Sequence, residues 1–124
     1  MGGAWWLHRL WRHSIVPETV QSSAVHPKVG LAIELLYEDP GIAISDVARR
    51  VGMSSTRLGQ VFRRQIGMTM SAFRTERRFE LFERLRHQRP STGLPTAALD
   101  AGFGDYSAFY RSYRRRYGHA PRQG

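Results

Sequence analysis

Two groups of polar side chains in this sequence have the types and the spacing to recognise a surface by hydrogen bonding. Thr56 lies four residues before Gln60, and Ser107 lies four residues before Arg111, with Tyr110 beside it. A spacing of four residues places two side chains on the same face of an α-helix. Glutamine and arginine can each form two parallel hydrogen bonds with a flat polar edge, such as that of a nucleic-acid base. The chemistry that these residues offer is recognition of a planar, polar target.

A set of arginines follows each group toward the C-terminus. The set consists of Arg63, Arg64, Arg114, Arg115 and Arg116. The formal net charge of the chain is +9, and the stretch from residue 45 to residue 124 alone carries +10. Such an excess implies a polyanionic partner and favours nucleic acid over a membrane surface. These arginines are therefore candidates to contact phosphates, a role that requires charge and reach but little geometry.

Catalysis and metal binding have no comparable signal in the sequence. The chain has no cysteine, and its 5 histidines lack the spacing of metal ligands. Gly102 and Gly104 open no strand-bounded phosphate loop, and Asp46, Asp100 and Asp105 have the positions of helix-end residues. We therefore expect no metal site, no cofactor and no enzymatic activity.

An internal repeat positions the two recognition groups. Ala48 and Gly52 correspond to Ala98 and Gly102 at an offset of 50 residues, and from Leu58 onward the offset is 51. The small alanine allows two helices to cross closely, and the glycine allows the tight turn between them. The second helix of each copy then buries one face and offers the other to a partner. The repeat predicts two helix-turn-helix units.

Turn and capping signals predict six helices and no strand, so we expect an all-α fold. The predicted helices cover about residues 27–37, 46–50, 55–65, 70–88, 95–101 and 106–117. Their predicted N-cap residues include Ser45, Ser54, Thr69 and Asp105. We expect the first unit at about 27–67, a long linker helix at about 70–88 and the second unit at about 94–118.

Hydrophobic periodicity predicts the buried face of each helix. On the first helix this face carries Val29, Ala32, Ile33 and Leu36. On the linker helix it carries Phe73, Phe79, Phe82 and Leu85. Burial of Leu58 and Phe62 in the third helix leaves Gln60 on the outer face, and burial of Phe109 in the sixth leaves Arg111 there.

The linker helix also carries arginines and glutamates close together. Arg74, Arg77 and Arg78 lie among the glutamates, and Glu80 and Arg84 have the i, i+4 spacing of an ion pair. We therefore expect at least one of these three arginines to have a partner inside the molecule.

The repeat, with its flanking residues, resembles the DNA-binding domain of the AraC/XylS family of bacterial transcription regulators over about residues 26–124. The first copy matches at Gly52-Met53-Ser54 and at Val61-Phe62-Arg63-Arg64. The second matches at Gly102-Phe103-Gly104-Asp105 and then at Ser107 and Phe109, the most specific signature of the family. The resemblance implies a regulator that places two recognition helices in successive major grooves of double-stranded DNA, as a monomer or in tandem. RNA polymerase is a candidate second partner.

The resemblance divides the candidate residues into two roles. The N-terminal part of a recognition helix meets the base edges, which selects Thr56, Gln60, Ser107, Tyr110 and Arg111. Arg111 suits guanine O6 and N7, and Gln60 suits adenine N6 and N7. Two other roles remain open for Tyr110, which are packing over the hydrophobic core and contact with the sugar-phosphate backbone. Because Gly59 offers no side chain at a reading position, we expect the second recognition helix to discriminate more strongly than the first.

Three residues depart from the family pattern. Phe82 stands where an alanine is usual on the linker helix, and Ala97 replaces a larger aliphatic residue. Pro95 occupies the position of a serine-type cap. We therefore expect different packing around residue 82 and a short or weakly held first helix in the second unit.

Residues 1–25 differ from the rest of the chain and form a tryptophan-containing segment with a linker. Trp6/Leu10 and Leu7/Trp11 have helical spacing, so the segment has the alternatives of a short amphipathic helix on a membrane surface or a loosely docked linker. No run is apolar enough to span a bilayer or to act as a signal peptide, so we expect a cytoplasmic protein at the nucleoid with no membrane partner. Most members of the family carry an effector domain before this one, and only about 25 residues precede it here.

Two further functions remain open on sequence grounds. The first is a stand-alone or truncated DNA binder that tolerates many sequences and competes for sites. The second is an interaction module that acts through residues 1–25.

Overall fold

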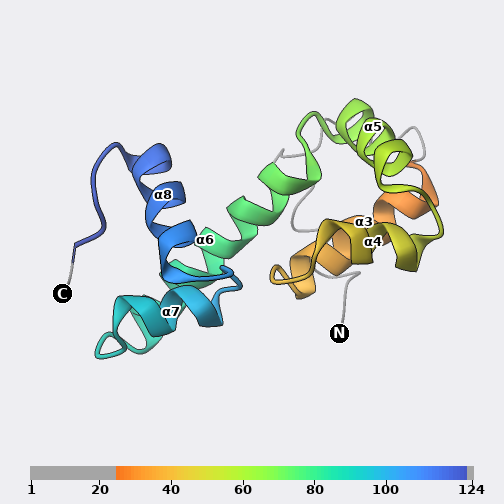
Figure 1. Cartoon of the computed structure of the whole chain (residues 1–124). Helices are drawn as coiled ribbons and strands as arrows, with labels where there is room; N and C mark the ends of the chain where they lie inside the picture. The colour runs from red at the N-terminus through yellow and green to blue at the C-terminus, as the bar shows by residue number, and fades with distance from the viewer. Residues whose placement is uncertain (1–24, 123–124) are drawn as a thin grey trace.

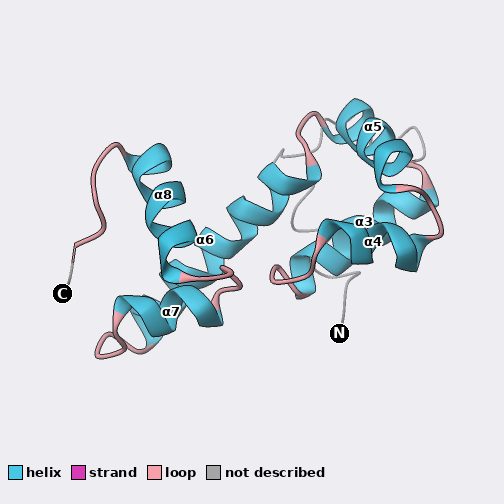
Figure 2. Cartoon of the chain, in the orientation of Figure 1, coloured by secondary structure: helices cyan, strands magenta, loops and turns pink. Residues whose placement is uncertain are grey.

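The computed structural model describes residues 25–122 of the chain. Within this range it contains six helices and no strand (Figure 1, Figure 2). The helices are α3 (Pro27–Glu38), α4 (Ile44–Val51), α5 (Ser55–Ile66), α6 (Met70–Gln88), α7 (Leu94–Asp100) and α8 (Tyr106–Tyr117). The predicted all-α fold is confirmed.

Two lobes lie at opposite ends of α6. Figure 1 shows α3, α4 and α5 gathered at one end of this helix and α7 and α8 at the other. Each lobe has its own hydrophobic core, and α6 supplies side chains to both. The two lobes are the two helix-turn-helix units, and α6 is the long helix between them.

The first core is built on the predicted hydrophobic faces. Val29, Ala32, Ile33 and Leu36 of α3 are fully buried, as are Leu58 and Phe62 of α5. The Phe62 ring meets the Phe73 ring of α6 edge to face, with centroids 5.8 Å apart. Such an aromatic pair contributes about 0.5–1.5 kcal/mol beyond the burial of its area. This packing holds α5 against the start of α6.

The second core contains two of the residues that depart from the family pattern. Phe82 is buried with its ring 4.7 Å from that of Phe109, and Ala97 is fully buried in the same cluster. The larger side chain at 82 and the smaller one at 97 therefore belong to the same core. The helix that carries Ala97, α7, has only 7 residues, with Gly93 as N-cap and no side-chain cap. The expected short helix is confirmed.

Three of the predicted N-caps are confirmed, and one is wrong. Ser54, Thr69 and Asp105 each accept a hydrogen bond from the backbone amide three residues later. The prediction of Ser45 as a cap fails because α4 starts at Ile44, with Ala43 as N-cap. The Ala43 carbonyl accepts the first helical hydrogen bonds of this helix. Ile44 packs against the first core, and this burial compensates for the missing side-chain cap.

Candidate nucleic-acid interface

The first recognition helix, α5, exposes the side chains that the sequence selected. Thr56, Gln60 and Arg63 are exposed, whereas Leu58 and Phe62 on the opposite face are buried. The exposed side chains line a shallow groove of about 410 Å³ with the start of α6. The groove is lined by Ile44, Ser55, Thr56, Gly59, Gln60, Arg63, Thr69, Met70 and Ser71.

Gly59 lies in this groove at the place where α5 approaches α6. A Cβ atom added there would meet Met70 Cε at 4.0 Å and nothing closer. The packing therefore leaves room for a methyl group, and the glycine is not required by contact with the rest of the protein.

The second recognition helix, α8, begins at the Asp105 cap and presents its first turns to solvent. Ser107 and Arg111 are exposed, and Tyr110 has 37% of its surface exposed. The Tyr110 ring lies 6.3 Å from that of Tyr106, which itself packs against the second core. Tyr110 thus extends outward over a neighbouring aromatic ring rather than into the core.

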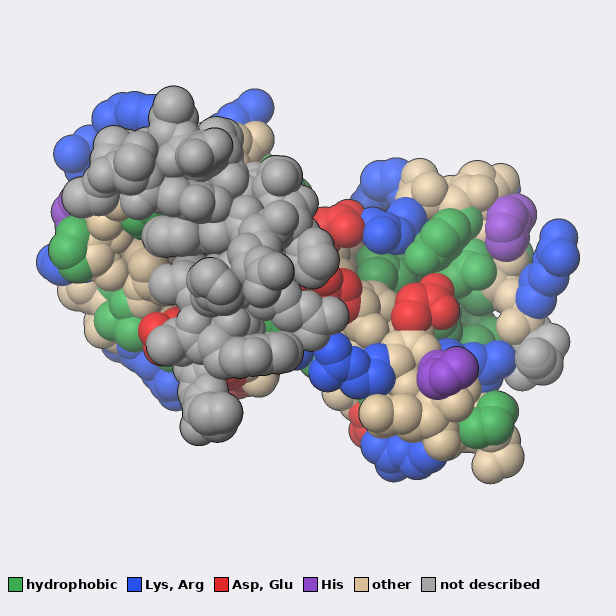
Figure 3. Space-filling view, turned by 180° about the vertical axis from the view of Figure 1, so that it is seen from behind, with side chains coloured by type: hydrophobic (Ala, Val, Ile, Leu, Met, Phe, Trp, Pro, Cys, Tyr) green, Lys and Arg blue, Asp and Glu red, His purple; other side chains and the backbone are tan. Residues whose placement is uncertain are grey.

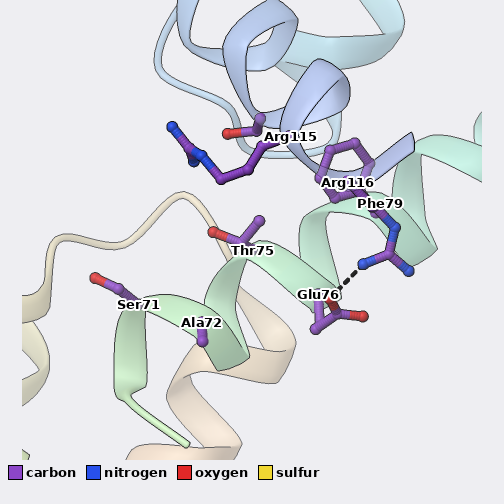
Figure 4. Close-up of a pocket in the computed structure, with 8 residues that line it drawn as sticks. Ser71, Ala72, Thr75, Glu76, Phe79, Arg115 and Arg116 are labelled. Carbon is purple, nitrogen blue, oxygen red and sulfur yellow. Dashed lines mark hydrogen bonds and ion pairs between the residues drawn. The ribbon is translucent and has the colours of Figure 1, made fainter. Parts of the chain in front are cut away.

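Four of the five predicted phosphate anchors are exposed without an ion pair among the described residues: Arg63, Arg64, Arg114 and Arg115. The fifth, Arg116, is ion-paired with Glu76 of α6, and its guanidinium lies 5.0 Å from the centre of the Phe79 ring (Figure 4). Burial acts to lower the pKa of Arg116, but hydrogen bonds to Glu76 and Tyr117 outweigh it and raise the pKa above its ordinary value. Arg116 therefore also ties α8 to α6.

A second groove of about 390 Å³ lies between α6 and α8. Figure 4 shows Arg115 above this groove and Ser71 and Thr75 on α6 below it. Its full lining is Ser71, Ala72, Thr75, Glu76, Phe79, Ser112, Arg115 and Arg116. Ser71 lines both grooves, so a continuous surface runs from α5 along the start of α6 to α8.

The small hydroxyl residues of this surface were not among the residues predicted from the sequence. Ser71 and Thr75 have an i, i+4 spacing on α6, and Ser112 faces them from α8. That spacing was a usable signal on the linker helix, but the part played by Ser112 depends on how α8 docks. A hydroxyl group can donate a hydrogen bond to a phosphate oxygen.

The arginines of α6 bind the end of α3 and the turn that follows it. Arg77 Nε donates to the Tyr37 carbonyl at 2.8 Å, and Arg74 Nη1 donates to the Ile42 carbonyl at 2.9 Å. Arg77 also ion-pairs with Glu80 at 3.3 Å and is only 8% exposed. The expected intramolecular partner is confirmed, and backbone carbonyls provide most of these contacts. The Tyr37 carbonyl lies in the last turn of α3, where the carbonyls carry partial negative charge and so attract guanidinium groups.

Charge is distributed unevenly over the surface. In the view from behind, acidic side chains lie where the two lobes meet and also on the lobes themselves, with Lys or Arg side chains beside them and along the outer edges (Figure 3). A polyanion is repelled from an acidic region and attracted to a basic one.

Residues 25–122 contain neither a membrane-spanning helix nor a cluster of metal-ligand side chains. No described helix is both long and apolar enough to cross a lipid bilayer. Within the same range, no three histidine, aspartate or glutamate side chains form a metal-binding group. The predicted amphipathic helix at the N-terminus lies outside the described residues.

Comparison with known proteins identifies relatives among bacterial regulators. The RCS-specific HTH-type transcriptional activator RclR of Escherichia coli is 26% identical over 106 residues, which are 84% of this chain and 37% of that protein. The virulence regulon transcriptional activator VirF of Yersinia enterocolitica is 34% identical over 83 residues, which are 67% of this chain and 30% of that protein. The HTH-type transcriptional regulator ExsA of Pseudomonas aeruginosa is 34% identical over 78 residues, covering 63% and 28% of the two chains. The chain spans about a third of the length of these relatives.

A solved structure shares the fold. The C-terminal domain of AraT, a response regulator from Geobacillus stearothermophilus, superposes with a TM-score of 0.70 at 17% identity. The match covers 78% of this chain and 82% of that domain. Residues 29–123, most of the chain, also match the helix-turn-helix domain family. The chain therefore belongs to the AraC-type helix-turn-helix family of DNA-binding transcription regulators.

Proposed function

We propose that residues 26–124 form a DNA-binding domain that reads a specific sequence by placing α5 and α8 in two successive major grooves. The observation that carries this proposal is the continuous surface on which Ser71 connects the groove beside α5 to the groove beside α8. Two successive major grooves on one face of B-DNA are separated by the minor groove and its two flanking phosphate backbones, so the surface between α5 and α8 would face phosphates. The helices at the two ends of the surface expose their candidate reading residues.

The base-edge roles are assigned by side-chain chemistry. Arg111 pairs with guanine O6 and N7, and Gln60 pairs with adenine N6 and N7. Thr56 and Ser107 supply hydroxyl groups near the N-terminal ends of the two helices, and Tyr110 contacts a base or sugar beside Arg111. The exposure of all five side chains supports these assignments.

The phosphate roles are assigned by charge and exposure. Arg63, Arg64, Arg114 and Arg115 are exposed and act as phosphate anchors. Arg116 contributes positive charge at the end of α8 while its pair with Glu76 holds that helix on α6. Ser71 and Thr75 add hydroxyl donors below Arg115.

The biological role follows from the named functions of the relatives. RclR and VirF are transcriptional activators, and we propose that this chain activates transcription in the same way, with RNA polymerase as its protein partner. It acts as a monomer or in tandem copies in the bacterial cytoplasm, at the nucleoid.

The experiment that tests the proposal is selection of bound duplexes from random DNA, followed by footprinting. Two protected major grooves about one helical turn apart, with preferred bases in each, support it. Protection of a single groove would contradict the two-helix mode. Equal binding of selected and random duplexes would favour a sequence-tolerant competitor for DNA sites.

A further inference from the structure

The two helix-turn-helix units touch directly through the turns that follow α3 and α7. Gly102, which follows α7, packs against the turn that follows α3. A Cβ atom added to Gly102 would lie 2.9 Å from Gly41 N and 3.0 Å from the Pro40 carbonyl carbon. Real Cβ atoms essentially never come within 3.0 Å of another heavy atom, so only glycine permits this approach of two backbones.

The equivalent glycine of the first unit has no such neighbour. Gly52 and Gly102 occupy the same place in the internal repeat, and both have positive φ, at 78° and 109°. A Cβ atom added to Gly52 would meet only Lys28 Nζ, the end of a flexible side chain, at 3.6 Å. The turn geometry requires glycine at both positions, but the contact between units requires it only at Gly102.

Arg78 of α6 holds the same contact from the side. Its Nε donates to the carbonyl of Pro40 at 2.7 Å, and its guanidinium lies 5.5 Å from the centre of the Phe103 ring. Pro40 itself is buried. Burial, with the charge of Arg74, lowers the pKa of Arg78 to about 10, so the side chain stays cationic at neutral pH. One side chain of α6 therefore contacts residues of both units.

The two units are connected at two places, and two connections fix their relative orientation where a single connection would allow rotation. The two hydrophobic cores are separate, and α6 connects them. The contact of Gly102 with the Pro40–Gly41 turn provides a second connection, to one side of the helix. Together they resist bending of α6 and rotation of one unit relative to the other.

We propose that this contact, formed by Pro40, Gly41, Arg78 and Gly102, sets the separation of α5 and α8 and so the number of base pairs that the protein accepts between its two reading sites. The proposal rests on the two-groove mode proposed above. Insertion of one base pair moves a reading site by about 3.4 Å and rotates it by roughly 35° around the DNA axis. A rigid pair of helices cannot follow both changes.

The test measures binding to a spacing series. A selected duplex is altered by −1, 0 or +1 base pair between its two footprinted grooves, and the dissociation constant of the full chain is measured by fluorescence anisotropy. For the wild-type protein we expect at least about a ten-fold loss at −1 and +1, because a misplaced helix loses at least one base-edge contact. We define the spacing ratio as the dissociation constant at −1 or +1 divided by that at the original spacing. Gly102→Ala should reduce this ratio to about three-fold or less.

Matched variants separate the contact from the turn and from the charge. Gly52→Ala strains the equivalent turn without touching the other unit, and Arg84→Gln removes an exposed arginine of α6; both should keep the wild-type ratio. Arg78→Gln removes the hydrogen bond to Pro40 and should flatten the ratio like Gly102→Ala. If Gly102→Ala does not fold, as judged by circular dichroism, Arg78→Gln decides the question.

Two results would overturn the proposal, and they are distinguishable. If the wild-type protein has a spacing preference that Arg78→Gln and folded Gly102→Ala retain, the contact does not set the spacing and the two-groove mode survives. If the wild-type protein binds all three spacings equally, the proposal fails, and footprinting decides the rest: protection of one groove means that the two-groove mode fails as well, and protection of two grooves means that it survives with flexible units.

Discussion

Arg116 of α8 forms an ion pair with Glu76 of α6 while its guanidinium lies 5.0 Å from the centre of the Phe79 ring. The pair lies at the edge of the groove that also contains Arg115, Ser71 and Thr75. The ion pair neutralises the Glu76 carboxylate, which would otherwise repel a phosphate in that groove. It also keeps the Arg116 guanidinium on α6, whereas Arg114 and Arg115 have no such partner among the described residues.

Removal of that carboxylate tests what the pair does. Glu76→Gln should free Arg116 to contact one more phosphate, so the slope of log K against log salt should steepen by about 0.9. Because the pair is partly exposed, stability should fall by no more than about 1 kcal/mol. Glu38→Gln removes the same charge from an exposed position at the end of α3 and provides the control. Equal slopes for the two variants would contradict a role for the pair in holding Arg116 back from DNA.

Salt dependence tests the set of phosphate anchors as a whole. If about 5 to 8 phosphates are neutralised, log K against log salt should have a slope between about −5 and −7. The measurement is a titration of one selected duplex at several salt concentrations. A slope shallower than about −2 would mean that most of the exposed arginines contact no phosphate.

Two arginines of α8 should have separable effects on binding. Arg111→Ala should relax the preference at one base pair by about 1–3 kcal/mol, whereas Arg115→Ala should weaken binding to all sequences alike. Each variant is titrated with the selected duplex, with its single-base substitutions and with random DNA. An equal loss for both variants on every duplex would contradict the base-edge role of Arg111. A larger loss of specificity in Gln60→Ala would make α5 the dominant reading helix.

The second core should depend strongly on the side chain that departs from the family pattern. Phe82→Ala removes a ring buried against Phe109 and should cost about 3–5 kcal/mol of stability. Ala97→Leu adds volume to the same core, so in the Phe82→Ala background it should restore at least about 1 kcal/mol. The same substitution in the wild-type protein should destabilise. Urea unfolding of the four proteins measures the coupling, and additive effects would contradict shared use of the core volume.

The local features of this protein could be predicted from its sequence because short-range physics controls them. The spacing of Val29, Ile33 and Leu36 identifies the buried face of α3, and the type of Ser54 and Asp105 identifies two helix starts. These signals act over one or two helical turns. Ser45 was misassigned because burial of Ile44 against a distant core outweighed the local capping preference.

The hydrophobic periodicity of the helices also predicted which side chains of the candidate interface are exposed. Gln60 and Arg111 lie opposite buried positions of their own helices, and the structure leaves both exposed. The exposed positions of one helix do not indicate which other helix packs beside it. The groove that joins Ser71 to Ser112 and Arg115 exists only because α8 docks across α6.

The amino-acid sequence by itself determined the helices, their buried faces and the family signature, whereas the tertiary structure alone decided how the two units are held. Gly52 and Gly102 are equivalent in the repeat, yet only at Gly102 would an added Cβ atom lie within 3.0 Å of another backbone. Arg78 of α6 shows the same limit, because it finds its partner 38 residues away at Pro40 rather than among the neighbouring glutamates. Contacts between residues distant in the chain depend on how whole helices pack, and neither residue type nor helical spacing encodes that packing.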